Sequence, residues 1–290
     1  MIENSQDFTE LLEGRISYSD LSVWFVCPHK FKLYKIFRLK NSPELMDYSI
    51  NLDFGTAIHE LLSKVNVYGD IAVSKRNLRG IFYKIVDDHR NFYKTKPTPK
   101  IVESTLQEGF YILDDVFKFF QHYRSDWQIF QREFELLEPM QNCIDNGLLN
   151  VEIAGLLFKG FIDLVMRNKT DNNKFWIVDY KTTASSWDNY ARNDEIKQMQ
   201  LLLYKYFWCH KNNVPLDNVK VSFLLLKKSV SGDNETRVEI VDVDSSTEKI
   251  QNCFQKINEA LSKILMADGL KIKPSNKCKW CSYNKTKWCP

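Results

Sequence analysis

The sequence predicts an α/β protein in which helices flank a mixed central sheet. Two short apolar runs, residues 161–166 (FIDLVM) and 175–180 (FWIVDY), are joined by a polar turn rich in Asn and Asp, as in β-hairpins. Residues 129–139, 219–229 and 236–244 have the composition of further strands. Longer stretches around these runs carry apolar residues at helical spacing, which predicts the flanking helices.

The composition is that of a globular chain with a substantial core. The chain has 290 residues, of which 44% are hydrophobic and 27% charged, with a net charge of +3. No apolar run reaches the length that a membrane-spanning helix needs. The N-terminal residues 1–15 are polar and acidic and do not resemble a secretory signal. We therefore expect a cytoplasmic protein with no membrane partner.

The chain is expected to divide into four parts. Residues 1–53 form an N-terminal helical arm, and residues 54–69 together with 126–245 form the α/β core. Residues 70–125 read as a helical insertion of two or three helices without catalytic spacing. Residues 246–290 form a C-terminal helix followed by a cysteine-containing tail.

Three local features follow from the residues alone. Ser19 can cap the first helix, and Pro28 breaks or kinks that helix. Residues 151–166 alternate well enough to form a pair of strands, with the bend near Gly155 or Gly160.

Two aspartates interrupt the apolar runs of the predicted hairpin. Asp163 and Asp179 stand where buried side chains are expected, and a buried carboxylate is costly unless something compensates its charge. A divalent cation between the two is the simplest compensation. Lys181 projects from the same strand face as Asp179, because side chains alternate with period two. Two carboxylates and an ammonium group at a strand end are the parts of a metal-dependent phosphodiesterase.

Several motifs in order along the chain resemble those of a known family. GFID at 160–163 and VDYKT at 178–182, with FGTAIHELL at 54–62, QMQLLLY at 198–204 and widely split cysteines, resemble the PD-(D/E)XK nucleases of the RecB-like exonuclease branch. The resemblance implies a restriction-endonuclease-like fold. The alternative is an ordinary hairpin whose Asp and Lys side chains are surface charges near a turn.

The resemblance implies a role for each matching residue near the hairpin. His59, Asp163, Asp179 and the carbonyl of Tyr180 would bind Mg²⁺ or Mn²⁺, and Lys181 would assist the attack of water on phosphorus. Without the motif match, a histidine on this helix reads as half-buried in the core. An imidazole ligand suits Mn²⁺ somewhat better than Mg²⁺.

Three further residues belong to the same resemblance. Gln200 and Tyr204 lie four residues apart, on one face of a predicted helix, and match residues that lie near the site and the DNA strand in the family. Glu133 precedes the GFID strand and is the weakest candidate, because a surface glutamate is an equally good explanation.

Seven cysteines occur in the chain, an odd number that argues against a disulfide framework. Cys278, Cys281 and Cys289 have ligand-like spacing near the end, and three thiolates need a fourth ligand. Cys27, followed by proline, is the partner that the resemblance supplies. This arrangement resembles the 4Fe–4S site of AddB-type and CRISPR-adaptation nucleases, with a four-cysteine zinc site as the alternative. The other three are expected to be buried thiols: Cys143, Cys209 and Cys253.

Basic residues cluster near both ends of the chain. Residues 28–40 contain five basic and no acidic side chains, and residues 270–290 contain six lysines and no acid. Aromatic residues are interleaved in both, as in a path for single-stranded DNA. A solvated lysine-rich face explains either segment alone equally well.

We therefore expect a Mg²⁺- or Mn²⁺-dependent DNA exonuclease that acts at strand ends in recombination or repair. One alternative is an endonuclease or a DNA-processing nuclease of the CRISPR-adaptation kind. Others are a catalytically silent DNA-binding subunit and a zinc-ribbon interaction module fused to an unrelated α/β domain. Because the chain lacks a Walker A motif, unwinding would have to come from a helicase or recombination partner.

Overall fold

A six-stranded mixed sheet forms the centre of the protein. The computed structural model describes residues 10, 12–39, 49–93, 95–151, 153, 155–232, 235–265 and 274–289. The strands are β1 (Arg15–Ser17), β2 (Trp127–Pro139), β3 (Leu157–Asn168), β4 (Phe175–Thr183), β5 (Val219–Lys227) and β6 (Val238–Asp242). Their order is β1-β3-β4-β5-β6, and β2 also pairs with β3. The predicted mixed sheet is confirmed.

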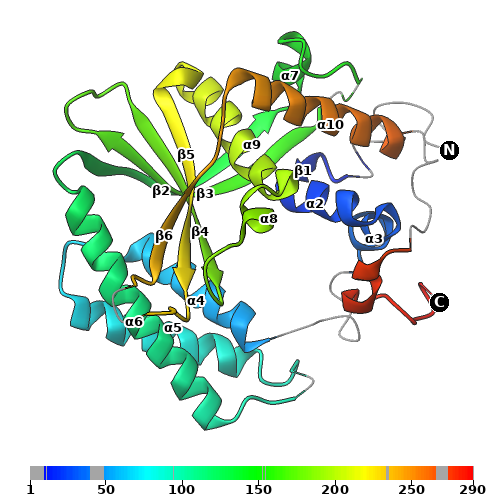
Figure 1. Cartoon of the computed structure of the whole chain (residues 1–290). Coiled ribbons are helices and arrows are strands. Elements are labelled where there is room, and N and C mark those ends of the chain that lie inside the picture. Colours follow the sequence, from blue (N-terminus) through cyan, green and yellow to red (C-terminus); the bar gives the residue numbers. More distant parts are fainter. Residues whose placement is uncertain are drawn as a thin grey trace.

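Helices cover both faces of the sheet (Figure 1). One set packs against Trp176 and Leu224: α4 (Ile50–Lys64), α5 (Ile71–Asp88) and α6 (Pro99–Tyr123). The other set packs against Phe158 and Phe223: α2 (Tyr18–Val26), α9 (Glu195–Asn212) and α10 (Thr247–Leu265). Shorter elements are α3 (Pro28–Phe31), η1 (Lys32–Ile36), α7 (Gln141–Asp145), α8 (Asn189–Arg192), η4 (Leu216–Asn218) and η5 (Asn276–Trp280).

The predicted hairpin is formed by β3 and β4, but the two strands pair over only part of their length. They are antiparallel from the Arg167–Phe175 pair to the Leu164–Val178 pair. At the other end of β3, residues 157–159 pair with β1, while β2 follows β3 along its opposite edge. Residues 160–163 therefore lie in a fork between the end of β1 and the departing β4.

Two local predictions are corrected by the structure. Ser17, not Ser19, caps α2, because Ser17 Oγ accepts from the amide of Asp20 at 3.2 Å while Asp20 Oδ2 accepts from the Ser17 amide at 2.9 Å. Residues 151–166 do not form a pair of strands, because β3 begins at Leu157 and continues through Gly160 without a bend. A Cβ at Gly160 would lie 2.7 Å from Cε1 of Tyr204, so this glycine serves close packing on α9.

The interruption expected at Pro28 is confirmed. Helix α2 ends at Val26, Cys27 is extended, and Pro28 opens α3 at the first helical position, where its missing N–H costs nothing. Helices α5 and α6 lie within the region expected to hold a helical insertion. No helix in the described part of the chain combines the length and apolar character needed to cross a membrane.

Candidate active site

Asp163 occupies the fork between β3 and β4. Once the strands diverge, the amide of Tyr180 no longer has a partner on β3, and it donates to Asp163 Oδ2 at 2.7 Å. The side chain of Asp163 thus replaces a ladder hydrogen bond at the point where the sheet opens. This hydrogen bond holds the buried carboxylate in a fixed position within the fork.

Asp179 is the more deeply buried carboxylate, with 2% of its surface exposed. Its Oδ1 accepts from Nε2 of Gln200 at 2.8 Å. Its Oδ2 lies 2.7 Å from Nζ of Lys181 as an ion pair, yet receives no hydrogen bond of acceptable angle. Burial raises the pKa of Asp179 to about 6, partly opposed by the charge of Lys181 and reinforced by that of Asp163.

Gln200 connects Asp179 with Lys181 and with Tyr204. Its Oε1 accepts from Nζ of Lys181 at 2.9 Å, and its Nε2 also lies 3.1 Å from the hydroxyl of Tyr204. Gln200 and Tyr204 are one turn apart on α9, as their spacing predicts. The structure therefore brings together four predicted site residues in one hydrogen-bonded network: Asp179, Lys181, Gln200 and Tyr204.

His59 reaches the fork from α4, on the other side of the sheet. Its Nδ1 lies 3.1 Å from Oδ1 of Asp163. Burial opposes protonation of His59, but the hydrogen bond with Asp163 and the charges of Asp163 and Asp179 outweigh it and raise its pKa. Gly55, one turn earlier, allows this approach, because a Cβ there would lie 2.9 Å from Oγ1 of Thr182.

Glu133 lies on β2, opposite the position of Asp163 on β3. The register pairs Arg132 with Leu164 and Phe134 with Ile162, so that Glu133 falls between the two pairs. Its φ of +44° is in the left-handed region, which is uncommon for glutamate and marks a local distortion of β2. Burial and then repulsion from Asp163 raise the pKa of Glu133, partly offset by His59.

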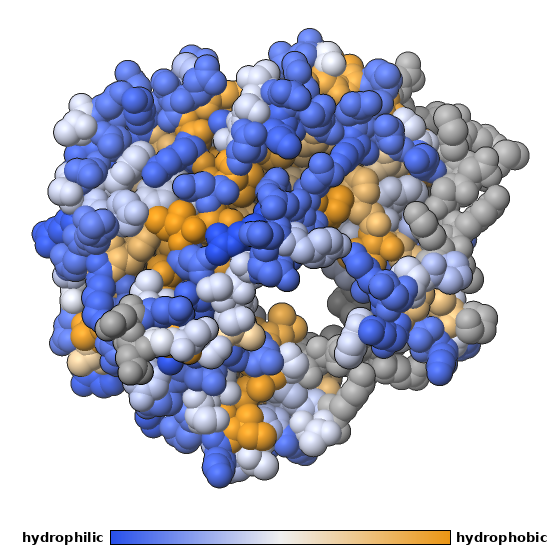
Figure 2. All heavy atoms as spheres, in the orientation of Figure 1, coloured by the Kyte–Doolittle hydropathy of each residue, from blue (hydrophilic) through white to orange (hydrophobic). Residues whose placement is uncertain are grey.

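An open cleft of about 860 Å³ lies in front of His59, Glu133 and Asp163, whereas Asp179, Lys181, Gln200 and Tyr204 are not among the residues that line it. The residues that line it are Asn51, Leu52, Gly55, Thr56, His59, Glu60, Ser63, Glu133, Phe161, Asp163 and Thr182. Figure 2 shows a hollow on the viewed face whose described rim is mostly hydrophilic.

The donor set fits a divalent cation in kind. The carboxylates of Asp163 and Asp179, the latter with an Oδ2 that lacks an aligned donor, and the imidazole of His59 match the ligands that Mg²⁺ and Mn²⁺ accept. Within the described residues, however, no three His, Cys, Asp or Glu groups converge closely enough to hold an ion. Tyr180 meets the site through its amide, which donates to Asp163. In this structure His59 contacts Asp163 directly, and Lys181 contacts Asp179 directly.

The four cysteines expected to act together line one cavity of about 250 Å³ between α3 and the C-terminal segment: Cys27, Cys278, Cys281 and Cys289. His29 Nε2 lies 3.0 Å from the carbonyl of Trp288 and joins the two segments. Burial, followed by the nearby thiols of Cys281, Cys27 and Cys278, raises the pKa of Cys289. The remaining three cysteines are buried, as predicted.

Only some of the aromatic residues in the basic segments are accessible. Phe31 and Tyr283 are buried, so neither can stack on DNA as the sequence suggested. Tyr283 packs against Leu33 instead. Trp280 is 80% exposed and Phe37 is also exposed, and each has a lysine ammonium group over its ring.

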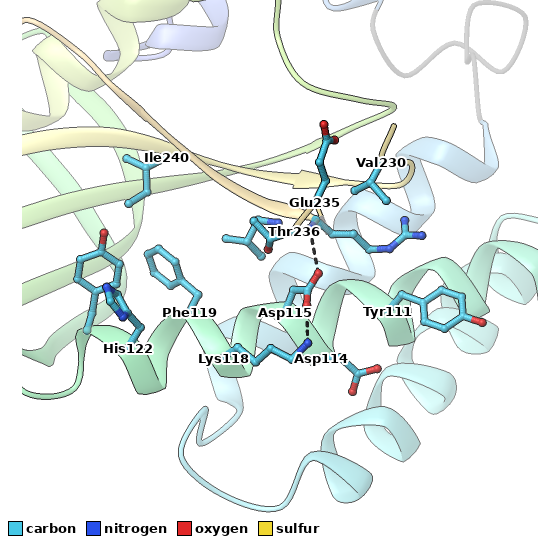
Figure 3. Close-up of a pocket in the computed structure, with 13 residues that line it drawn as sticks. Tyr111, Asp114, Asp115, Lys118, Phe119, His122, Val230, Glu235, Thr236 and Ile240 are labelled. Carbon is cyan, nitrogen blue, oxygen red and sulfur yellow. Dashed lines mark hydrogen bonds and ion pairs between the residues drawn. The ribbon is translucent and has the colours of Figure 1, made fainter. Parts of the chain in front are cut away.

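A second cleft of about 780 Å³ lies between α6 and β6 (Figure 3). Its charged groups satisfy one another: Asp115 accepts from the Arg237 amide at 2.9 Å and pairs with Lys118 at 3.0 Å. Asp114 pairs with Lys75 at 2.7 Å. Of these three contacts, the one between Asp115 and the Arg237 amide joins α6 to the segment that leads into β6, whereas Lys118 pairs within α6 and Lys75 belongs to α5.

Sequence reasoning missed three residues at the site. Tyr18, at the start of α2, has its pKa raised by burial and by the charges of Asp179 and Asp194. The side chain of Thr182 packs against Gly55. Phe161 lines the cleft beside Asp163. No sequence signal distinguishes Phe161 from a core residue, because an aromatic side chain in a strand is ordinarily buried.

The fold and the carboxylate–lysine arrangement define a nuclease-type α/β protein, and comparison with known proteins identifies the family. The profile of the PD-(D/E)XK nuclease superfamily matches residues 15–290, and the chain belongs to this superfamily. A crystal structure from Eubacterium rectale, of a protein described provisionally as an exonuclease, is similar in fold with a TM-score of 0.55. The two chains are 13% identical, and the match covers 98% of this chain and 91% of the other. No curated protein matches the chain.

Proposed function

We propose that the chain is a DNA exonuclease of the RecB-like branch that requires Mg²⁺ or Mn²⁺ and hydrolyses phosphodiester bonds at strand ends. The observation that carries this proposal is the network at the fork. A buried aspartate, a lysine two residues later and a glutamine from α9 contact one another, while a second aspartate lies across the fork. Membership of the superfamily supports a nuclease, and the description of the Eubacterium rectale protein supports an exonuclease.

His59, Asp163, Asp179 and the Tyr180 carbonyl would hold the divalent ion. When bound, the ion would activate water and stabilise charge at the phosphorus. Lys181 keeps a positive charge beside Asp179 for the developing negative charge of the phosphate. Gln200 fixes the positions of both Lys181 and Asp179, and Tyr204 in turn orients Gln200.

The cavity lined by four cysteines would hold a 4Fe–4S cluster. Its support is that Cys27 and the three C-terminal cysteines line the same cavity, although their thiols do not meet at metal-binding distance. Four thiolates also suit zinc. Iron, acid-labile sulfide and zinc analysis of anaerobically purified protein separates the two: iron and sulfide in equal amounts support the cluster, and zinc alone contradicts it.

The accessible rings and lysines beside that cavity would guide single-stranded DNA. Trp280 and Phe37 are exposed and each has a lysine ammonium group nearby, so each offers a ring for a base and a charge for a phosphate. An unwinding partner, such as a helicase in recombination or repair, would supply the strand.

A cleavage assay tests the activity. End-labelled linear single- and double-stranded DNA and closed circular DNA are incubated with Mn²⁺, Mg²⁺ or EDTA. We expect loss of nucleotides from linear ends, only with a divalent ion, and a fall of at least 100-fold in Lys181→Ala, on the order found when one transition-state charge contact is removed. Lys118→Ala, which alters an exposed lysine on α6, is the matched control.

Each remaining outcome of this assay contradicts the proposal in a definite way. Cutting of closed circles would make the protein an endonuclease, as in CRISPR-adaptation-type processing. DNA binding without cleavage by wild type under any condition would make it a silent DNA-binding subunit. Equal activities of wild type and Lys181→Ala would remove the fork from the mechanism.

A further inference from the structure

Phe161 presents an aromatic ring to solvent in the cleft that contains the site carboxylate Asp163. Its residue surface is 45% exposed, whereas its neighbours Gly160 and Ile162 on β3 are buried. The ring lines the cleft together with His59. Exposed aromatic surface is normal when scattered singly, but here it faces the polar groups of a reaction site.

The position of the ring is fixed by a rigid strand. Residue 161 is paired with Glu135 in the β2–β3 ladder, and the adjacent Gly160 packs closely against the Tyr204 ring. Tyr204 belongs to the Gln200 network, so the backbone carrying the ring is tied directly to the site. A group held in this way loses little conformational entropy when a ligand binds to it.

A cation lies beside the same ring. The ammonium Nζ of Lys159 is 5.1 Å from the centroid of Phe161, and it also lies 3.4 Å from Oε1 of Glu135. A flat ring with a nearby ammonium group is the combination that single-strand binding proteins use for a base and its phosphate. A side chain of a protein partner would also pack on the ring, but binding of a protein would not explain the carboxylates in the same cleft.

We propose that Phe161 stacks on an unpaired nucleobase of the substrate, next to the phosphodiester that is hydrolysed, with Lys159 near the adjoining phosphate. This inference rests on the proposed nuclease function and deepens it. A base inside a duplex is covered on both faces by its neighbours, so a ring in the cleft selects single-stranded or frayed ends.

The test measures binding of wild type, in Ca²⁺ without Mg²⁺ or Mn²⁺, to single-stranded oligonucleotides that carry one abasic residue at successive positions from the end. We expect one position near the end to weaken binding about tenfold or more, since stacking of one base contributes about that much. Phe161→Leu should bind intact DNA correspondingly weakly and lose the sensitivity at that position. Phe161→Trp should retain both affinity and sensitivity.

Phe130→Ala is the matched control. Phe130 is 43% exposed, lies on the neighbouring strand β2 and also has a cation, Arg167, over its ring. It does not line the cleft, so its removal should leave the abasic profile unchanged. Thermal unfolding of each variant verifies that the fold is intact.

The outcomes separate this inference from the proposed function. If wild type cleaves DNA but Phe161→Leu keeps the abasic profile, stacking by Phe161 is wrong and the nuclease assignment stands. If wild type neither binds nor cleaves DNA, the proposed function fails first. If blunt duplex binds as tightly as single strands and Phe161→Leu weakens both equally, the selection of unpaired bases is contradicted.

Discussion

Asp179 carries its charge in the most buried position of the site, and its environment only partly compensates that charge. Gln200 and Lys181 each contact one carboxylate oxygen, yet Oδ2 has no aligned donor. A buried carboxylate with incomplete partners destabilises the folded state when ionised. A functional cation would remove that cost, which gives a physical reason for the residue to be charged.

Replacing Asp179 with Asn is expected to stabilise the protein in EDTA at pH 8. The pKa of Asp179 in the folded state is about 6, above its ordinary value of 3.8, so the bound proton contributes stability below pH 3.8 that is lost as the pH rises through 6. At pH 8 the variant should gain on the order of 1–3 kcal/mol over wild type.

Denaturant unfolding at pH 5 and pH 8, with the exposed Asp217→Asn as control, measures this difference. The advantage of Asp179→Asn should shrink at pH 5, where the wild-type carboxyl is largely protonated. A stability advantage that is larger at pH 5 than at pH 8 would show that ionisation of Asp179 does not destabilise the folded protein.

At the scale of elements, the fork between β3 and β4 positions the site. Strand β3 changes its partner from β1 to β4 around residues 160–163. The backbone amide of Tyr180 therefore has no partner on β3 and donates to the Asp163 carboxylate instead. Helix α9 packs closely against the same point because Gly160 has no Cβ. The distance between sheet and α9 therefore sets the reach of Gln200 to Asp179.

Gly160→Ala is expected to lower both stability and activity. The new Cβ would lie 2.7 Å from the Tyr204 ring, so the ring must move and carry Gln200 with it. Overpacking of this kind costs about 1–3 kcal/mol. Thermal unfolding and the cleavage rate measure the two effects.

Gly80→Ala on α5 is the control for a glycine-to-alanine change. A Cβ at Gly80 meets nothing within 4 Å, so alanine should raise helix stability by about 1 kcal/mol or less. If Gly160→Ala behaved like Gly80→Ala, the close packing of Tyr204 would have no energetic importance.

At the scale of the whole molecule, segments near the two ends of the chain meet. Cys27 and three C-terminal cysteines line one cavity, and His29 contacts the Trp288 carbonyl. A metal group there would close a loop of nearly the whole chain, and closing long loops restricts the unfolded state most.

With the proposed metal group at the four cysteines, Cys27→Ser is expected to contain less metal and to melt at a lower temperature than wild type. Metal content by elemental analysis is the primary measurement, with Cys253→Ala as the control because Cys253 is buried on α10 and does not line the cavity. Full metal content in Cys27→Ser would show that Cys27 is not a ligand.

The sequence predicted the elements of this fold better than their relations. Two apolar runs joined by a polar turn identified β3 and β4, and the charge in these runs singled out Asp163 and Asp179. It could not show the change of strand partners at the fork, because pairing is a long-range property. The sequence predicts Ser19 as the cap of α2, but the structure places Ser17 there, because Ser17 forms the reciprocal bonds with Asp20. The exposure of Phe161 and the burial of Tyr283 depend on what packs above them.

Single-turnover cleavage of linear DNA by Asp163→Asn and Asp179→Asn, compared with Asp217→Asn, tests the central claim most directly. The account predicts that the first two lose at least 100-fold in rate in Mg²⁺ or Mn²⁺ while remaining folded, since each removes a charge at the fork. Asp217→Asn should cleave as wild type does. Wild-type rates in both fork variants would contradict the account, because the hydrolysis would then occur elsewhere in the protein.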